Sequence, residues 1–190
     1  MTFVLRVDEQ VQLRQLEEAH LDEHFLLLMK NKHFIGVWEP WVNAISYDGQ
    51  LDYVRYMQDQ QANGIAFTCG IWYAESHDAA YRLVGNVTYR VSRDVRSTEL
   101  GYWLAEAYTH RGIVTRAVKT LMHHAFETDN LNRVLIRAAA GNTASCAVAE
   151  RLGFHLDGVI RGDLRLNGDT IDRAIYTMLA ADWRSAQSGL

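Results

Sequence analysis

The stretch from Glu99 to Arg116 most constrains how this chain can fold, because it predicts a buried strand, a short loop and a helix in immediate succession. Apolar residues occupy both odd and even positions between Leu100 and Leu104, which is typical of a strand buried on both faces. From Val114 onwards the apolar residues recur at steps of three and four, as on a helix with one apolar face. The pattern therefore predicts a strand that leads directly into a helix N-terminus.

The loop between that strand and that helix has the features of an anion site. The unpaired N–H groups of a first helical turn, together with the helix dipole, favour a negative charge. Gly112 lies where the helix is expected to begin, and Arg111 and Arg116 add positive charge nearby. The glycine motifs of Walker-type sites and of dinucleotide folds are absent. We expect the loop to bind a diphosphate of another kind, and the alternative is an ordinary helix N-terminus.

Length and composition favour one globular domain. The chain has 190 residues, 48% hydrophobic and 22% charged, and we expect residues 1–190 to form a single domain. Its 19 basic and 23 acidic residues give a net charge of −4 without a long basic run, so nucleic-acid binding has little electrostatic support. Two distant cysteines, Cys69 and Cys146, favour a reducing compartment. Without a visible signal peptide or membrane-length apolar run, we expect a cytoplasmic protein that binds no membrane.

The rest of the chain alternates strands and helices. Strands are expected over 3–7, 11–16, 66–73, 81–92, 98–104, 133–140, 154–166 and 170–179. Helices are expected over 17–31, 48–61, 112–128 and 143–152. Residues 34–41 are expected to form a loop, and Asn167-Gly168 is the strongest hairpin signal. This order predicts an α/β fold in which helices pack against a mixed sheet.

A second motif follows the strand expected over 133–140. Asn142 stands at a helix N-cap position and Ser145 in the exposed first turn. The segment Asn142-Thr143-Ala144-Ser145-Cys146-Ala147-Val148-Ala149-Glu150-Arg151-Leu152-Gly153-Phe154 closely resembles the Asn-x-x-Ser-x-x-Val-x-x-Lys-Leu-Gly-Phe segment of the GNAT N-acetyltransferase superfamily. The coenzyme A loop of that superfamily, Gln/Arg-x-x-Gly-x-Gly/Ala, is matched at Gly112, while Thr109 and Val114 depart from it.

Further segments resemble the RimJ/RimL branch of that superfamily, the ribosomal-protein N-terminal acetyltransferases. Glu99-Leu100-Gly101-Tyr102-Trp103-Leu104 is similar to the Glu-Ile-Gly-Tyr-Trp-Leu strand of the branch, and Trp38-Glu39-Pro40-Trp41 to its Trp-Leu-Pro-Trp region. The resemblance implies the GNAT-like acyl-CoA N-acyltransferase fold, an α/β fold with a mixed central sheet, splayed parallel strands and helices on both faces. A homodimer is expected on the resemblance alone.

The resemblance also implies acetyl transfer from acetyl-CoA to a primary amine. We expect Glu99 to hold a water at the amine, Ser145 to protonate or orient the leaving thiolate, and Asn142 to bind the pantetheine amides or the acetyl oxygen. An N-terminal α-amine, with a pKa of ~7.7–8.0, needs only a modest base, whereas a lysine at ~10.4 needs a tuned one. The structural alternatives are a strand-end carboxylate, a helix-surface serine and an N-cap.

The residues expected to bind acetyl-CoA lie at the end of the strand, on the loop or on the two following helices. They are Trp103, Leu104, Ala105, His110, Arg111, Gly112, Ile113, Val114, Thr115, Asn142, Ser145 and Arg151. Val114 is compatible with the loop if its side chain faces the sheet. For the acceptor cleft we expect Trp38, Trp41 and Tyr176, with core or loop packing as the alternative.

The acceptor stays open at this point. The leading expectation is the N-terminal α-amine of a protein, and the first alternative is a small amine such as an antibiotic, a polyamine or an aminoacyl nucleotide. The second alternative is a non-catalytic acyl-CoA-binding module, which Thr109 and Val114 favour. His20-Leu21-Asp22-Glu23-His24 matches a zinc pattern, but no third ligand is visible nearby, so we expect no metal.

Overall fold

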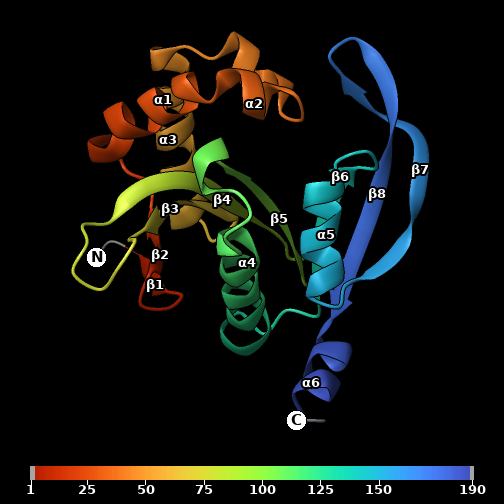
Figure 1. Cartoon of the computed structure of the whole chain (residues 1–190). Helices are drawn as coiled ribbons and strands as arrows, with labels where there is room; N and C mark the ends of the chain where they lie inside the picture. The colour runs from red at the N-terminus through yellow and green to blue at the C-terminus, as the bar shows by residue number, and fades with distance from the viewer. Residues whose placement is uncertain (1–2, 189–190) are drawn as a thin grey trace.

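The computed structural model describes residues 3–188, whose strands form one mixed sheet in the order β1-β2-β3-β4-β5-β6-β8-β7 (Figure 1). The strands are β1 (Val4–Arg6), β2 (Val11–Gln15), β3 (Ala66–Tyr73), β4 (Arg82–Ser92), β5 (Ser97–Leu104), β6 (Arg133–Ala139), β7 (His155–Leu166) and β8 (Asp169–Leu179). The helices are α1 (Leu21–Lys30), α2 (Lys32–Gly36), α3 (Tyr47–Ala62), α4 (Ile113–His123), α5 (Thr143–Arg151) and α6 (Ala180–Ser188). Shorter helical turns are η1 (Glu18–His20), η2 (Pro40–Ala44), η3 (Glu106–Tyr108) and the π-type turn η4 (His124–Thr128).

The predicted strands are confirmed, and each end differs from its expected position by no more than one residue. The helical predictions need three corrections. Residues 34–41 are not a plain loop, because α2 occupies their start and Pro40 begins η2, where the missing proline N–H costs no helical bond. The helix expected over 17–31 begins as the separate turn η1. The C-terminal helix α6 was not predicted, although it buries Ala180 and Trp183 at a spacing of three.

Strands β5 and β6 run parallel and separate after a short contact. They pair only at Ser97↔Arg133, Thr98↔Val134 and Glu99↔Leu135. Beyond Glu99, β5 stays with β4 as far as Leu104, and β6 stays with β8. We call this divergence the splay. It confirms the predicted splayed strands, and it leaves one edge of β5 free of strand partners within the part of the chain that the structure describes.

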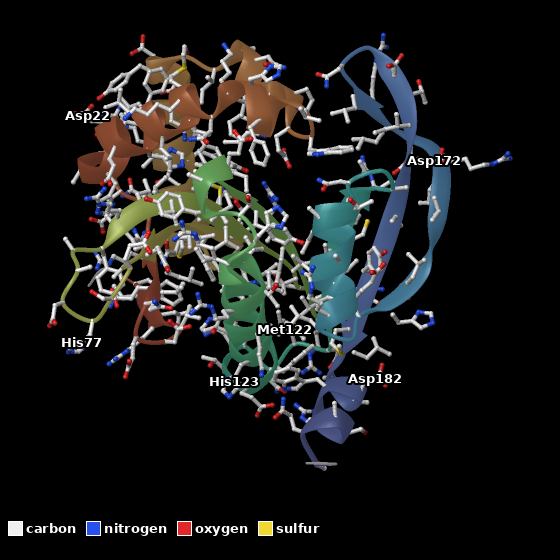
Figure 2. All side chains as sticks on the ribbon, viewed as in Figure 1. Asp22, His77, Met122, His123, Asp172 and Asp182 are labelled. Atoms are coloured by element: carbon white, nitrogen blue, oxygen red, sulfur yellow. The ribbon has the colours of Figure 1, made fainter. Side chains whose placement is uncertain are left out.

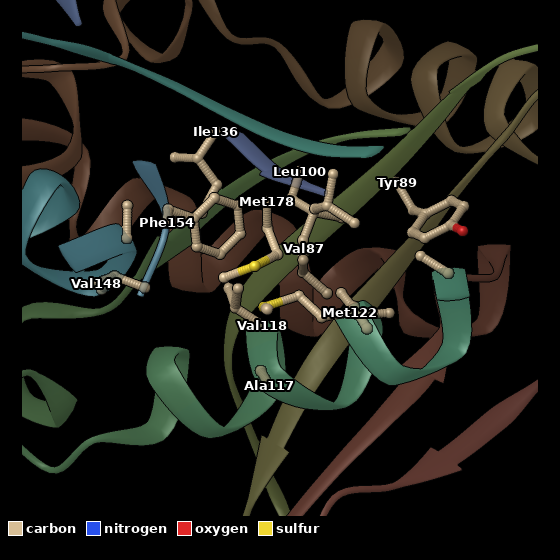
Figure 3. Close-up of a cluster of buried hydrophobic side chains, with 14 of the residues drawn as sticks. Val87, Tyr89, Leu100, Ala117, Val118, Met122, Ile136, Val148, Phe154 and Met178 are labelled. Carbon is tan, nitrogen blue, oxygen red and sulfur yellow. The ribbon is translucent and has the colours of Figure 1, made fainter. Parts of the chain in front are cut away.

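One face of the sheet is covered by α4 and α5, and the main apolar core lies beneath them (Figure 1). Val87 of β4 and Leu100 of β5 contribute to this core with Val118 and Met122 of α4 (Figure 3). Burying each such side chain contributes roughly 1.5–3 kcal/mol. Met122 and the adjacent His123 show the two sides of α4, because Met122 is buried and His123 is exposed to solvent (Figure 2).

The opposite face is covered by α1, α2 and α3. Leu28, Ile35 and Val42 form one small core there, and Leu16, Leu21 and Val54 form another. Helices therefore lie on both faces, as expected. No helix within residues 3–188 is long and apolar enough to cross a lipid bilayer.

Candidate active site

The loop before α4 is shaped by two residues with left-handed backbone. His110 has a φ of +60° and Gly112, the N-cap, a φ of +68°. A Cβ on Gly112 would meet nothing within 4 Å, so glycine is needed for its dihedral angle and not for space. The first helical bond runs from the Arg116 N–H to the Gly112 carbonyl at 3.0 Å. The N–H groups of residues 113–115 precede it and have no helical acceptor, so they form a cradle for an anion.

The two departures from the coenzyme A loop are accommodated by the fold. Val114 packs against the main core, which confirms that its side chain faces the sheet. The Thr109 hydroxyl donates a hydrogen bond to the Glu106 carbonyl at 2.7 Å and so stabilises η3. Neither side chain blocks the outward N–H groups of the first helical turn.

Both arginines near this loop are paired with carboxylates. Arg111 Nη1 lies 2.9 Å from Glu75 Oε1, and Arg116 Nη1 lies 2.6 Å from Asp8 Oδ2. The position of Arg116 in the sequence had led us to expect its side chain near the loop. The side chain points instead to the β1–β2 turn, where Asp8 lies. Since both positive charges are already partly compensated, the backbone N–H groups supply most of the attraction for an anion.

The end of β5 presents alternate N–H groups to its two sides. The Ala105 N–H donates to the Val84 carbonyl at 2.8 Å and is thus engaged on the β4 side. Because successive N–H groups of an extended chain point in opposite directions, the Leu104 N–H faces the splay. Leu104 and Ala105 are both expected to bind acetyl-CoA, and of their two amides only that of Leu104 faces the splay. The Trp103 side chain packs on the opposite face with Leu28 and its neighbours.

The N-terminus of α5 meets β5 across the splay. Asn142 is the N-cap, and its Oδ1 accepts a hydrogen bond from the Ser145 N–H at 3.1 Å. The Tyr102 hydroxyl lies 3.1 Å from Ser145 Oγ and 3.3 Å from the Ser145 carbonyl oxygen. Burial raises the pKa of Tyr102 to about 12, so this phenol keeps its proton and can donate it. Arg151 is exposed in the last turn of α5, roughly 9 Å along the axis from Ser145.

A cleft of about 470 Å³ opens on the face of β4 and β5 that lies opposite α4 and α5. Alternate residues of the two strands form its floor, and α1, η2 and α3 form its walls. Gly101 lies in the floor, where a Cβ would be 3.6 Å from Arg90 Nη1, so the absent side chain leaves room. The lining also includes His24, Glu39, Trp41, Gln50, Tyr53, Asn86, Thr88, Tyr102 and Trp103.

Glu99 stands where β5 and β6 begin to separate. Its carboxylate forms an ion pair with Arg137 of β6, and 29% of its side chain is exposed. It is not among the described residues that line the cleft. The fold therefore places Glu99 near the splay and pairs it with a guanidinium, and its role in holding a water stays a prediction.

The three side chains expected at the acceptor lie in three places. Trp41 lines the cleft and donates from Nε1 to Glu39 Oε2 at 2.7 Å. Trp38 lies against Gly141 in a second cavity, with its ring 3.6 Å from the position of a Cβ on that glycine. Tyr176 is 4% exposed beneath α5, where its hydroxyl donates to Glu150 Oε1 at 3.0 Å and burial raises its pKa. Of these three, the structure brings Trp41 to the cleft.

Two polar side chains of the cleft were missed in the sequence. His24 is 1% exposed, and neither ring nitrogen has a hydrogen-bond partner within residues 3–188. Burial lowers its pKa from 6.5 to about 4, so the imidazole is neutral. The spacing of His20 and His24 matches a zinc pattern, but Nδ1 of His20 already accepts a hydrogen bond from the Glu17 N–H. Residues 3–188 hold no cluster of three potential metal ligands.

The second missed residue is Glu39. Burial raises the pKa of its carboxyl group, while the Trp41 hydrogen bond and the Arg90 charge act in the opposite direction. A signal was present in the sequence, because Glu39 stands where the Trp-Leu-Pro-Trp region of the RimJ/RimL branch has leucine.

Comparisons with known proteins agree with this arrangement. The sequence profile of the acetyltransferase (GNAT) domain matches residues 10–155. YdaF of Bacillus subtilis (strain 168), provisionally assigned as a ribosomal N-acetyltransferase, is 34% identical over 188 residues, which cover 95% of this chain and 97% of YdaF. The ribosomal-protein-serine acetyltransferase of Escherichia coli (strain K12) is 26% identical over 183 residues, 94% of this chain and 98% of that enzyme.

The solved structures show the same fold. RimL, the ribosomal L7/L12 alpha-N-protein acetyltransferase solved in complex with coenzyme A, superposes with a TM-score of 0.87 at 24% identity, over 95% of this chain and 99% of RimL. The expected fold class is thereby confirmed. With the family profile spanning most of its length, the chain belongs to the GNAT acetyltransferases.

Proposed function

We propose that this protein transfers the acetyl group of acetyl-CoA to the α-amine at the N-terminus of a protein. The observation that carries the proposal is the position of β5, which has the splay along one edge and the cleft on one face. A thioester held in the splay and an amine held in the cleft would meet at this strand. The E. coli relative is named for a serine of a ribosomal protein, and RimL was solved with coenzyme A. We extend both properties to this chain, with a cytoplasmic location and a homodimer as parts of the same proposal.

The chain offers a binding group for each part of acetyl-CoA. The N–H groups of residues 113–115 would hold the pyrophosphate, with Arg111 and His110 on the same loop. The Leu104 N–H faces the splay, where it would bind the pantetheine arm or polarise the thioester. The side-chain oxygen Oδ1 of Asn142 already accepts the N-cap hydrogen bond, so the side-chain NH₂ remains for a pantetheine or acetyl oxygen.

Ser145 is the group proposed at the leaving sulfur. The thiol of coenzyme A resembles a free cysteine, with a pKa of ~8.5, so a weak donor is sufficient. The Ser145 hydroxyl can donate to the sulfur while the protonated Tyr102 hydroxyl donates to Ser145 Oγ. On the amine side, Glu99 is the expected holder of a water, and an α-amine requires no stronger base.

The cleft volume favours a second candidate, acetylation of a small amine. About 470 Å³ falls in the range of small-molecule sites, ~300–1,000 Å³. The third reading, an acyl-CoA-binding module without chemistry, draws less support from Val114, because that side chain packs against the core.

The test is release of thiol from acetyl-CoA with a panel of peptides and small amines. We expect the fastest turnover with peptides that carry a free N-terminus, and no turnover when that amine is blocked. Faster turnover of small amines would support the second candidate. Binding of acetyl-CoA without turnover of any amine would contradict catalysis.

A further inference from the structure

The cleft contains a carboxyl group that the branch pattern lacks. Glu39 replaces the leucine of the Trp-Leu-Pro-Trp region and lines the cleft together with Tyr53, Arg90 and Trp41. Pro40 begins η2 immediately after it, and the proline ring restricts the backbone conformation of Glu39. Leucine at this position would complete an apolar wall, whereas glutamate places a polar group in it.

The two oxygens of Glu39 differ in their surroundings. Oε2 accepts the 2.7 Å hydrogen bond from Trp41 Nε1. Oε1 has no hydrogen-bond partner within residues 3–188, and Arg90 forms no ion pair with Glu39 there. One oxygen therefore orients the carboxyl group, and the other is available to an acceptor in the cleft.

The surroundings of Glu39 suit a proton acceptor. The titratable side chains that face Glu39 in the same cleft are the neutral His24, Tyr53 and the guanidinium of Arg90, whereas the Tyr102 hydroxyl lies at Ser145 across the splay. Burial raises the pKa of Glu39, and a carboxylate of higher proton affinity is the better general base near neutral pH. Glu99, by contrast, has its carboxylate engaged by Arg137 and lies outside the cleft lining.

We infer that Glu39 binds the ammonium group of the acceptor in the cleft and takes up its proton. The inference rests on the proposed acetyl transfer. An N–H bond of the ammonium breaks and its proton moves to Oε1 of Glu39, which frees the nitrogen lone pair to form the bond to the thioester carbon. The electron pair of the C–S bond leaves with the sulfur, which takes a proton from the Ser145 hydroxyl. The nitrogen loses its second proton as the amide forms, and this proton, passed through solvent, replaces the one that Ser145 has given. Glu39 returns its proton to solvent when the amide product leaves.

The test compares Glu39→Gln with Glu99→Gln and with Glu127→Gln as the matched control. Glu127 is an exposed carboxylate of η4 that faces Arg184, at the far end of α4. The kcat and the acceptor KM of the full chain are measured from pH 6.5 to 9.5, with acetyl-CoA and the best acceptor of the unmodified protein. We expect Glu39→Gln to lower kcat about tenfold at pH 7, and to approach the unmodified protein near pH 9, where an amine with a pKa of ~7.7–8.0 is already deprotonated. Glu127→Gln should leave both constants unchanged.

Three results for Glu39→Gln would overturn the inference. They are an unchanged kcat at pH 7, a rise in the acceptor KM with kcat intact, and a loss of kcat that is equal at pH 7 and pH 9, since the last indicates altered packing. A loss of kcat in Glu99→Gln but not in Glu39→Gln also overturns the inference. It would mean that the proton of the acceptor passes to the water held by Glu99. If Glu39→Gln does not fold, Glu39→Leu restores the residue of the branch and is measured in the same way. If the unmodified protein acetylates no amine, the proposed function fails instead.

Discussion

The Tyr102 hydroxyl on β5 lies 3.1 Å from the Ser145 hydroxyl on α5, across the splay. The two residues come from different elements, and their contact exists because β5 leaves β6 after Glu99. We expect Tyr102→Phe to lower kcat by roughly 2–10-fold, since one neutral hydrogen bond is worth about 0.5–1.5 kcal/mol. Ser145→Ala should cost more, and the double variant no more than Ser145→Ala alone. Steady-state kinetics of the three variants checks this coupling, and strictly additive losses would show that the two hydroxyls act independently.

Replacing Gly112 should weaken the anion cradle. Gly112→Ala places a Cβ on a backbone with a φ of +68°, which costs about 1–2 kcal/mol or shifts the loop. We expect lower stability and weaker acetyl-CoA binding, measured by chemical unfolding and calorimetric titration. Gly158→Ala is the matched control, because its Cβ would also meet nothing within 4 Å and its φ is not positive. Equal effects of the two substitutions would contradict a special role of the loop.

The protein should lose stability in mild acid because of His24. Burial lowers the pKa of His24 from 6.5 to about 4, so the unfolded chain binds this proton at a higher pH than the folded one. Stability is therefore full above pH 6.5 and falls as the pH drops toward 4, by roughly 3 kcal/mol. His24→Phe keeps a ring beside Trp103 and should flatten this fall, whereas exposed His77→Gln should not. Urea unfolding between pH 4 and 7.5 measures the difference, and parallel curves for all three proteins would contradict it.

Glu39 should destabilise the folded protein at neutral pH. Because burial raises the pKa of its carboxyl group, the folded state binds this proton more tightly than the unfolded chain does. Below the pKa that Glu39 has in the unfolded chain, its carboxyl group does not lower the free energy of unfolding. The loss of stability grows as the pH rises above that value and is complete once the pH has passed the raised pKa of the folded state. Glu39→Leu should therefore raise Tm at pH 7–8 more than at pH 4, in thermal melts followed by circular dichroism. A Tm that falls at pH 7 would mean that the carboxylate is needed for packing.

Local signals in the sequence were sufficient for the positions of the strands and for parts of the site. Alternating and continuous apolar runs placed the strands, Asn142 was recognised as an N-cap, and the helical period allowed Val114 to face the sheet. Helix α6 was missed because β8 passes into it at Leu179–Ala180 without a separating turn.

The details of the site depend on partners far apart in the chain. Arg116 pairs with Asp8, 108 residues away, so its distance from the loop could not be predicted from the local sequence. Glu99 lies 38 residues from Arg137, and Tyr102 lies 43 from Ser145. No periodicity reveals such contacts, because they follow from how the strands separate and where α5 docks.

The central claim is that the loop before α4 and the splay together hold acetyl-CoA with its sulfur beside Ser145. Calorimetric titration of the full chain with acetyl-CoA tests it most directly, alongside Gly112→Ala. We predict a saturable heat with one cosubstrate per chain, a rise in Tm on binding, and a clear loss of affinity in Gly112→Ala. No heat at millimolar acetyl-CoA together with an unchanged Tm would contradict the claim.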